Sequence, residues 1–302
     1  MIDQIAATVA QNESLGDCEV RVLMIPFAGY DNVASKSLIN LNARRRSERI
    51  FIKISNSQKL SRFLQGEADS LNACAALGIE SIPKVLASGM IEGRYFIAER
   101  FVPGPKMHSS PSYLNTALSE TKDWLAVLYE RTRGEPVEPA RLIRRAGEYA
   151  GLASGFFELG DCLGMMEKLS PQTPIPTHRI HGDFWHGNIL LKRGGGVCVT
   201  DFAFSAPGEP PIDHLDLVCD YDTNVFLDPK RLRSYVGMFP IKVDELPFLL
   251  LYALIRKIGL KVERRKALYE ELLLNDLESS MGEISEVGFA KRFFHCCETR
   301  QS

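Results

Sequence analysis

The spacing of apolar and polar residues changes once along the chain, close to residue 102. Before that point, short apolar segments alternate with a period of two, and the clearest runs from 49 to 55, where Ile50, Ile52 and Ile54 alternate with Lys53 and its neighbours. This alternation predicts a strand with Lys53 on the face opposite the isoleucines. Four further strands are predicted at residues 18–26, 37–42, 85–90 and 94–101.

One helix is predicted among these strands. From residue 58 to 77 the apolar positions follow a helical stripe, Glu67 lies near the middle, and Gly78 provides a stop signal. The segment Pro-Gly-Pro at 103–105 then interrupts regular structure, and we predict a hinge there.

Helical patterns dominate after this hinge. Residues 113–129 and 139–169 are predicted as helices, residues 188–192 and 197–200 as a hairpin around three glycines, and the part from 212 onward as mostly helical. The sequence therefore predicts an α+β protein with two lobes. The first lobe, 1–102, would hold a small mixed sheet with one helix, and the second, 103–302, would be larger and mainly helical.

Composition and charge narrow the class of protein. The 302 residues are 45% hydrophobic and 25% charged, as in ordinary globular proteins, and a net charge of -2 provides no general attraction to nucleic acid or to an acidic membrane. The seven cysteines are scattered and form no CxxC pair, which favours reduced thiols. The longest apolar run, 248–255, is shorter than the roughly 20 residues of a membrane span, and the first residues lack the basic charge of a secretory signal. We expect a soluble, cytoplasmic protein.

The candidate chemistry lies between His181 and Asp201. Asp183 stands five residues before Asn188, and Asp201 follows Asn188 by thirteen residues, at the end of a predicted strand. Phosphoryl transfer requires a carboxylate that receives the proton of the attacking hydroxyl, and oxygen ligands that hold Mg²⁺ against the phosphates of a nucleotide. The spacing predicts Asp183 as the catalytic base, and Asn188 and Asp201 as the metal ligands.

These residues resemble the aminoglycoside phosphotransferase and choline kinase-like family. The matching segments are 181–183 followed by Asn188, then 201–203, then 208–213. The resemblance implies a two-lobed protein kinase-like fold and transfer of a phosphoryl group from ATP, or another nucleoside triphosphate, with Mg²⁺. The acceptor would be a hydroxyl of a sugar, an aminoglycoside or an amino alcohol. Either Asp213 or Asp216 would steady the catalytic loop through its backbone.

The first lobe would supply the remaining nucleotide-binding residues. Lys53 on the third strand is predicted to neutralise the α- and β-phosphates, and Glu67 on the following helix to pair with Lys53 and fix its position. Residues 29–37 would cover the phosphates, although they lack the usual glycine pattern, and the base would lie near residues 99–102.

Other interpretations stay open at this point. His181, Asp183 and His186 are also compatible with a metallohydrolase, and a kinase-like binding or regulatory protein that has lost its activity is a second alternative. A protein-substrate kinase is disfavoured by the short connection after Asp201. For the acceptor, nearly balanced net charge favours a neutral, sugar-like molecule, whereas one acidic stretch would suit a cation: Asp213, Asp216, Asp220, Asp222 and Asp228.

Overall fold

The computed structural model describes residues 1–15, 18–24, 34–43, 47–107, 114–218, 242 and 244–272. The chain forms two compact units, one made of Met1–Glu120 with His186–Ser205 and the other of Thr121–Trp185 with Ala206–Ser302. The lobe boundary expected between residues 102 and 103 stays a prediction, because units defined by packing need not coincide with lobes defined by a nucleotide hinge. The loop expected to cover the phosphates lies mostly outside the described residues, which resume at Ala34.

A five-stranded sheet forms the centre of the first unit, with strand order β1-β2-β3-β5-β4. Its strands are β1 (Cys18–Met24), β2 (Ala34–Ala43), β3 (Ser47–Ser55), β4 (Val85–Ile91) and β5 (Arg94–Arg100). All neighbouring strands pair antiparallel, so the mixed sheet expected from the sequence is corrected to an antiparallel one. The reason is that β5 inserts between β3 and β4, which run in the same direction but do not pair.

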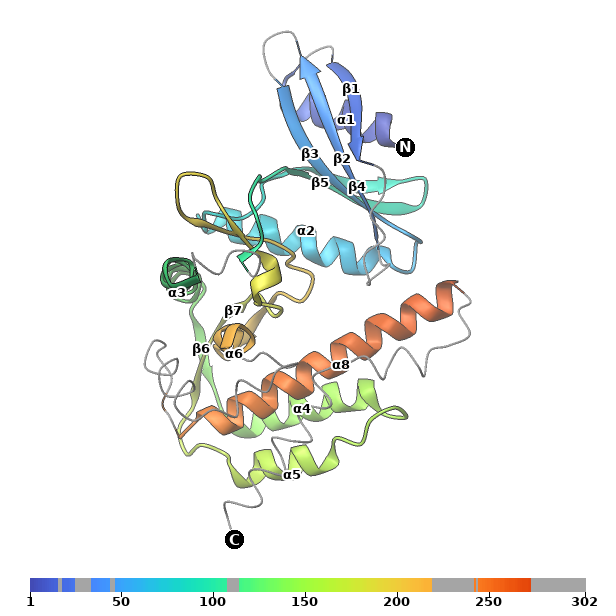
Figure 1. The fold of residues 1–302 in the computed structure, drawn as a ribbon. Helices are drawn as coiled ribbons and strands as arrows, with labels where there is room; N and C mark the ends of the chain where they lie inside the picture. Colours follow the sequence, from blue (N-terminus) through green and yellow to red (C-terminus); the bar gives the residue numbers. More distant parts are fainter. Residues whose placement is uncertain are drawn as a thin grey trace. The chain divides into compact units, whose positions relative to one another are not determined.

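The two faces of this sheet carry different helices (Figure 1). Helix α1 (Ile2–Asn12) packs its buried Ile5 and Val9 on the face that holds Ile50 and Ile52. Helix α2 (Ser61–Ala76) covers the opposite face, where its Leu64 and Ala68 pack with buried residues of β5, namely Tyr95 and Ile97. Lys53 pairs across the strands with Ile97 and therefore lies on the α2 face, as the alternation predicts.

A short hairpin of β8 (Ile189–Leu191) and β9 (Val197–Val199) also belongs to the first unit, and confirms the predicted pair of strands. The Pro-Gly-Pro segment runs beside β8, where Leu191 N–H donates to the carbonyl of Pro105 at 2.9 Å. A Cβ atom on Gly104 would lie 2.2 Å from the backbone oxygen of Leu191, so only glycine fits this close approach.

The second unit is mainly helical, as predicted. Its helices, as far as the structure describes this unit, are α3 (Leu114–Arg131, from residue 121 onward), α4 (Pro139–Ala153), α5 (Gly160–Lys168), α6 (Asp213–Val218) and α8 (Leu246–Leu272). A three-stranded antiparallel sheet of β10 (Ala206–Glu209), β7 (Ile175–Ile180) and β6 (Gly134–Val137) was not predicted. Each of these short strands contains a proline, which removes a hydrogen-bond donor and weakens the sequence signal for a strand.

Helix α8 lies against α4 and α5 (Figure 1). Every residue from Phe248 to Ile255 is buried, so this part of the helix is apolar all round and forms the interior of the second unit. The helix approaches α4 so closely at Gly259 that a Cβ atom there would lie 2.3 Å from the backbone oxygen of Tyr149. None of the helices within the described residues has the length and apolar character that crossing a membrane requires.

Candidate active site

Lys53 is the centre of the charged cluster in the first unit. Its Nζ lies 2.5 Å from Oε1 of Glu67 on α2, which confirms the contact, though not the role, that the sequence suggests for this pair. The same Nζ lies 3.2 Å from Oε1 of Glu99 on β5, in an ion pair without hydrogen-bond geometry. All three side chains are buried, and two carboxylates therefore flank one ammonium.

Burial and charge set the protonation of this cluster. Burial would lower the pKa of Lys53, but the negative charges of Glu67, Glu99 and Asp201 outweigh it and hold that pKa well above its usual range. Burial raises the pKa of Glu99 to about 7, against the opposing effect of the Lys53 ammonium. Lys53 is thus a fixed cation near neutral pH, and Glu99 takes up a proton more readily than an exposed glutamate does.

A cavity of about 300 Å³ in the first unit brings these groups to one place. Lys53 and Glu99 line it together with Asn188 and Asp201, and the segment Arg100, Phe101 and Val102 after β5 forms another part of the wall. Four polar side chains from β3, β5 and the two ends of the β8–β9 hairpin therefore share one hollow. A cation fixed in such a hollow suits an anionic ligand with phosphates.

The hairpin holds Asn188 and Asp201 near each other. The backbone oxygen of Asn188 accepts from Thr200 N at 2.9 Å and from Thr200 Oγ1 at 3.2 Å, and Asp201 follows directly. Asp201 has φ of +66°, in the left-handed region that non-glycine residues rarely adopt, and such strained residues cluster at functional sites. An amide oxygen and a carboxylate facing one cavity are a donor set that suits a hard cation such as Mg²⁺.

The loop that carries Asp183 belongs to the second unit and is fixed by α6. Asp213 accepts from the backbone N–H of His181 at 2.8 Å and of Gly182 at 2.7 Å. Asp216 accepts from Phe184 N at 3.2 Å. The expectation that Asp213 or Asp216 steadies this loop is therefore confirmed for both, with Asp213 making the shorter contacts.

Asp183 itself is paired with a lysine of α8. Nζ of Lys257 lies 3.0 Å from Oδ1 of Asp183 and 3.2 Å from Oδ1 of Asp216. Burial would raise the pKa of Asp183, but the Lys257 ammonium, together with Lys261 and His181, lowers it to about 2. Asp183 is ionised at any physiological pH.

The predicted site residues thus fall into two groups. Lys53, Glu67, Asn188 and Asp201 lie in the first unit, and three of them line its cavity, whereas Asp183 lies in the second unit. Their roles stay predictions.

The sequence did not predict two of the side chains that contact these residues, namely Glu99 beside Lys53 and Lys257 beside Asp183. The sequence signal for Glu99 is a carboxylate within an apolar strand, and the signal for Lys257 is a charge that directly follows an apolar helical stretch.

The metallohydrolase alternative lacks support from the geometry. His181 is fully buried inside its loop, where its Nδ1 accepts from Asp183 N at 3.3 Å and its ring meets Phe184 edge-on. Across the part of the chain that the structure describes, no group of three or more His, Cys, Asp or Glu side chains is arranged to hold a metal ion.

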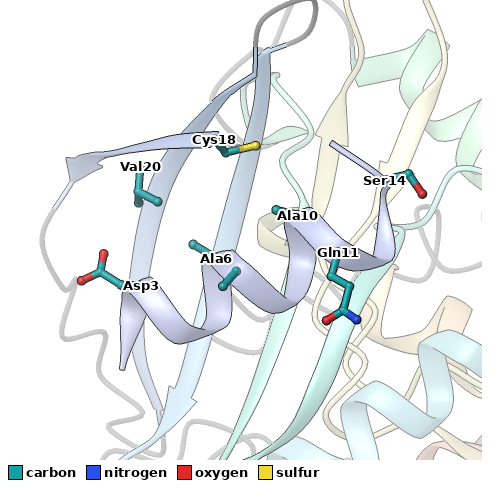
Figure 2. A pocket seen from close by; sticks show the side chains of 8 residues that line it. Asp3, Ala6, Ala10, Gln11, Ser14, Cys18 and Val20 are labelled. Carbon is teal, nitrogen blue, oxygen red and sulfur yellow. The ribbon is translucent and has the colours of Figure 1, made fainter. Parts of the chain in front are cut away.

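A second hollow, of about 500 Å³, lies between α1 and β1 (Figure 2). Its lining consists mostly of small residues such as Ala6, Ala10 and Cys18, with Asp3 as the charged side chain among the residues that line it. None of the described residues that line this hollow is a cation that could bind a phosphate, so the candidate nucleotide site is the cavity beside Lys53.

An antiparallel sheet with an internal lysine–glutamate pair, followed later in the chain by the Asp183 loop, the β8–β9 hairpin and further helices, is the arrangement of a kinase-like fold. The sequence model of the phosphotransferase enzyme family matches residues 33–230, and the chain belongs to this family. It is thus a phosphotransferase of this family, and it has a kinase-like α+β fold.

Individual relatives agree with this placement. The chain is 23% identical over 223 residues to a protein named Probable ketoamine kinase of Vibrio vulnificus, covering 64% of this chain and 72% of that one. The choline kinase LicA of Streptococcus pneumoniae has a similar fold, with a TM-score of 0.62 at 12% identity, covering 97% of this chain and 99% of the other. An aminoglycoside phosphotransferase in a ternary complex with ADP and hygromycin B also reaches 0.62 at 12% identity, covering 94% and 96% of the two chains.

Proposed function

We propose that this protein transfers the γ-phosphoryl group of a nucleoside triphosphate, ATP in the first place, to a hydroxyl of a small sugar-like molecule in the presence of Mg²⁺. The observation that carries the proposal is the buried Lys53 ammonium, which faces the same cavity as Asn188 and Asp201. A fixed cation and a set of oxygen ligands are the groups that a triphosphate requires. The aminoglycoside phosphotransferase with the similar fold holds ADP, which supports a nucleotide as the donor.

In this proposal Lys53 binds the nucleotide phosphates, and Glu67 keeps its ammonium in place. Asn188 and Asp201 would hold Mg²⁺, which when bound neutralises charge on the phosphates during transfer. Glu99 provides a second anchor for Lys53, so that the ammonium is oriented before the nucleotide arrives.

Asp183 acts on the acceptor in this proposal. The acceptor oxygen forms a bond to the γ-phosphorus as the bond between that phosphorus and the β,γ-bridging oxygen breaks, and the nucleoside diphosphate leaves. The hydroxyl proton passes to the carboxylate of Asp183. A carboxyl whose pKa lies near 2 is a weak base, so its main contribution is to orient the hydroxyl and to receive the proton late in the reaction.

The aspartates on and after α6 bear on whether the acceptor is cationic or neutral. Asp213 and Asp216 are buried and engaged with the loop backbone, and Asp216 also with Lys257, so these two do not form a surface for a cationic acceptor. Asp220, Asp222 and Asp228 lie outside the described residues. A hydroxyl-rich, sugar-like acceptor is therefore favoured.

A cytoplasmic location is part of the proposal. Nucleoside triphosphates are available there, and the four described cysteines are free thiols: Cys18, Cys74, Cys162 and Cys198.

The proposal is tested by incubating the protein with ATP, Mg²⁺ and a panel of sugars, ketoamines, amino alcohols and aminoglycosides. ATP consumption and the mass of the product are measured, and we expect one phosphoryl group on a sugar-like acceptor. The KM of that acceptor should change little with added salt, because no ion pair is lost through screening. A steep rise of the KM with salt would contradict a neutral acceptor, and the absence of any phosphorylated product across the panel would contradict the proposed function.

A further inference from the structure

We propose that Lys257 is a positioning residue for phosphoryl transfer, whose ammonium orients the Asp183 carboxylate toward the acceptor hydroxyl. This inference rests on the proposed function, because it assumes that Asp183 receives the acceptor proton. Lys257 lies on helix α8, far along the sequence from the loop that carries Asp183.

The contacts of Lys257 connect the proposed base to the group that holds the loop. One ammonium lies 3.0 Å from Oδ1 of Asp183 and 3.2 Å from Oδ1 of Asp216. The other oxygen of Asp216, Oδ2, accepts from Phe184 N, one residue after Asp183. Lys257 therefore fixes the side chain of Asp183 to the same carboxylate that fixes the backbone beside it.

The surroundings of Lys257 argue against a purely structural role. Its side chain is 6% exposed and follows an apolar stretch of α8 that ends at Ile255. Burying a charged pair costs several kcal/mol in lost hydration, and well-packed apolar residues often stabilise a protein as well or better. A lysine at this position is thus expected to serve the chemistry of Asp183 rather than the stability of the unit.

Within the described part of the second unit, the charges around Asp183 come from three elements. His181 lies in the same loop, Asp216 on α6, and Lys257 and Lys261 one turn apart on α8. Lys257 makes the direct contact, and its charge and hydrogen bond lower the pKa of Asp183 while burial raises it. If Lys257 loses its charge, the effect of burial remains, so the pKa of Asp183 must rise.

The test compares the wild type with Lys257→Met and with the control Lys266→Met. Lys266 lies on the same helix but donates to the backbone oxygen of Leu152. We expect Lys257→Met to lower kcat by at least about tenfold, with the Kd of the nucleotide changed less than about twofold. The pH profile of kcat/KM should gain an acidic limb that the wild type and Lys266→Met lack.

A double variant keeps the test valid if Lys257→Met alone does not fold. Lys257→Met leaves Asp216 without its buried cation, whereas Lys257→Met with Asp216→Asn removes one charge of each sign, and the asparagine oxygen can still accept from Phe184 N. This double variant should fold and still show the acidic limb, because it also lacks the ammonium at Asp183.

A carboxyl titration separates this inference from the proposed function. Protein labelled with ¹³C at aspartate side chains, with Asp183 assigned from Asp183→Asn, reports the pKa without turnover. A rise of at least about one pH unit in the folded double variant supports the inference. An unchanged pKa, or a raised pKa with wild-type kcat, would overturn it. If the pKa rises but the wild type phosphorylates no acceptor, the proposed function is wrong. The contact between Lys257 and Asp183 then has no role in phosphoryl transfer.

Discussion

The carboxylate of Asp213 accepts a hydrogen bond of 2.7 Å from the backbone N–H of Gly182, a residue with φ of +81°. The left-handed backbone at Gly182 turns two consecutive amides, its own and that of His181, toward the same carboxylate. The contact therefore depends on a glycine in the loop and on the first residue of α6.

This relationship predicts the effect of Gly182→Ala. A residue with a Cβ atom costs about 1–2 kcal/mol in the left-handed region, so the folded protein should lose stability by that amount. If the loop relaxes instead, the two amides leave Asp213, and kcat should fall with little change in the Kd of the nucleotide. Denaturant unfolding and steady-state kinetics measure the two effects, and Gly164→Ala, at a helical position with open space, is the control.

Asp183→Asn should lower kcat by roughly a hundredfold or more, the scale of losing a general base. Nucleotide affinity should stay close to that of the wild type, since the proposed nucleotide-binding residues lie elsewhere in the chain. Single-turnover kinetics and nucleotide titration check the prediction. Near-normal turnover would remove Asp183 from the mechanism.

Glu67→Gln should weaken the function of Lys53 only in part, because Glu99 still pairs with the ammonium. A charge-assisted hydrogen bond contributes about 1.5–3 kcal/mol, so the single change is expected to cost about tenfold in kcat/KM for the nucleotide. Changing both glutamates to glutamine leaves Lys53 buried without either anion and should cost more than the product of the single effects. A double-mutant cycle measures this coupling, with Asp69→Asn on the exposed side of α2 as the control. Strictly additive effects would show that Glu99 does not support Lys53.

Nucleotide binding should require Mg²⁺ and should weaken in Asp201→Ala, because the carboxylate is a proposed ligand of the ion. His186→Ala should keep its Mg²⁺-dependent activity. Calorimetric titration with and without Mg²⁺ tests both variants. Tight zinc binding that disappears in His186→Ala would instead favour the metallohydrolase alternative.

His214 makes the stability of the second unit dependent on pH. Burial lowers the pKa of this histidine to about 3, below its usual 6.5. The unfolded chain therefore binds a proton below about pH 6.5 that the folded chain takes up only near pH 3, and the free energy of unfolding falls by about 1.4 kcal/mol per pH unit between these values. His214→Met should remove this slope. Urea unfolding at pH 6.5 and at pH 5 should show a difference between the two proteins that changes by about 1.5 kcal/mol, and parallel pH dependence would contradict it.

Sequence patterns predicted the parts of this protein that depend on local spacing. The alternation around Lys53 predicted which face of the sheet carries this lysine. The apolar stripe around Glu67 predicted the helix whose Glu67 contacts Lys53. Glu99 was missed as a partner of Lys53, because that contact requires the order of strands, in which β5 lies beside β3. Spacing along the chain does not encode that order.

Contacts between distant segments escaped prediction for the same reason. Lys257 meets Asp183 only because α8 packs in one way within the second unit, and no periodic pattern connects the two positions. The small sheet was missed for a different reason: Pro136, Pro176 and Pro207 interrupt its three strands, and tertiary packing outweighs their low strand propensity.

The buried cations of α8, Arg256 and Lys257, determine how this helix is oriented when it packs in the second unit. From Phe248 to Ile255 the helix is apolar on every side, so hydrophobic burial alone would tolerate many rotations about the helix axis. The next two residues remove that ambiguity, because Arg256 lies 3.8 Å from Glu209 while Lys257 reaches Asp183 and Asp216. A slip by one residue turns the helix by about 100° and would leave both cations buried away from their carboxylates. The two charges thus favour a single rotation of the helix about its axis. In this rotation the Lys257 ammonium contacts Asp183.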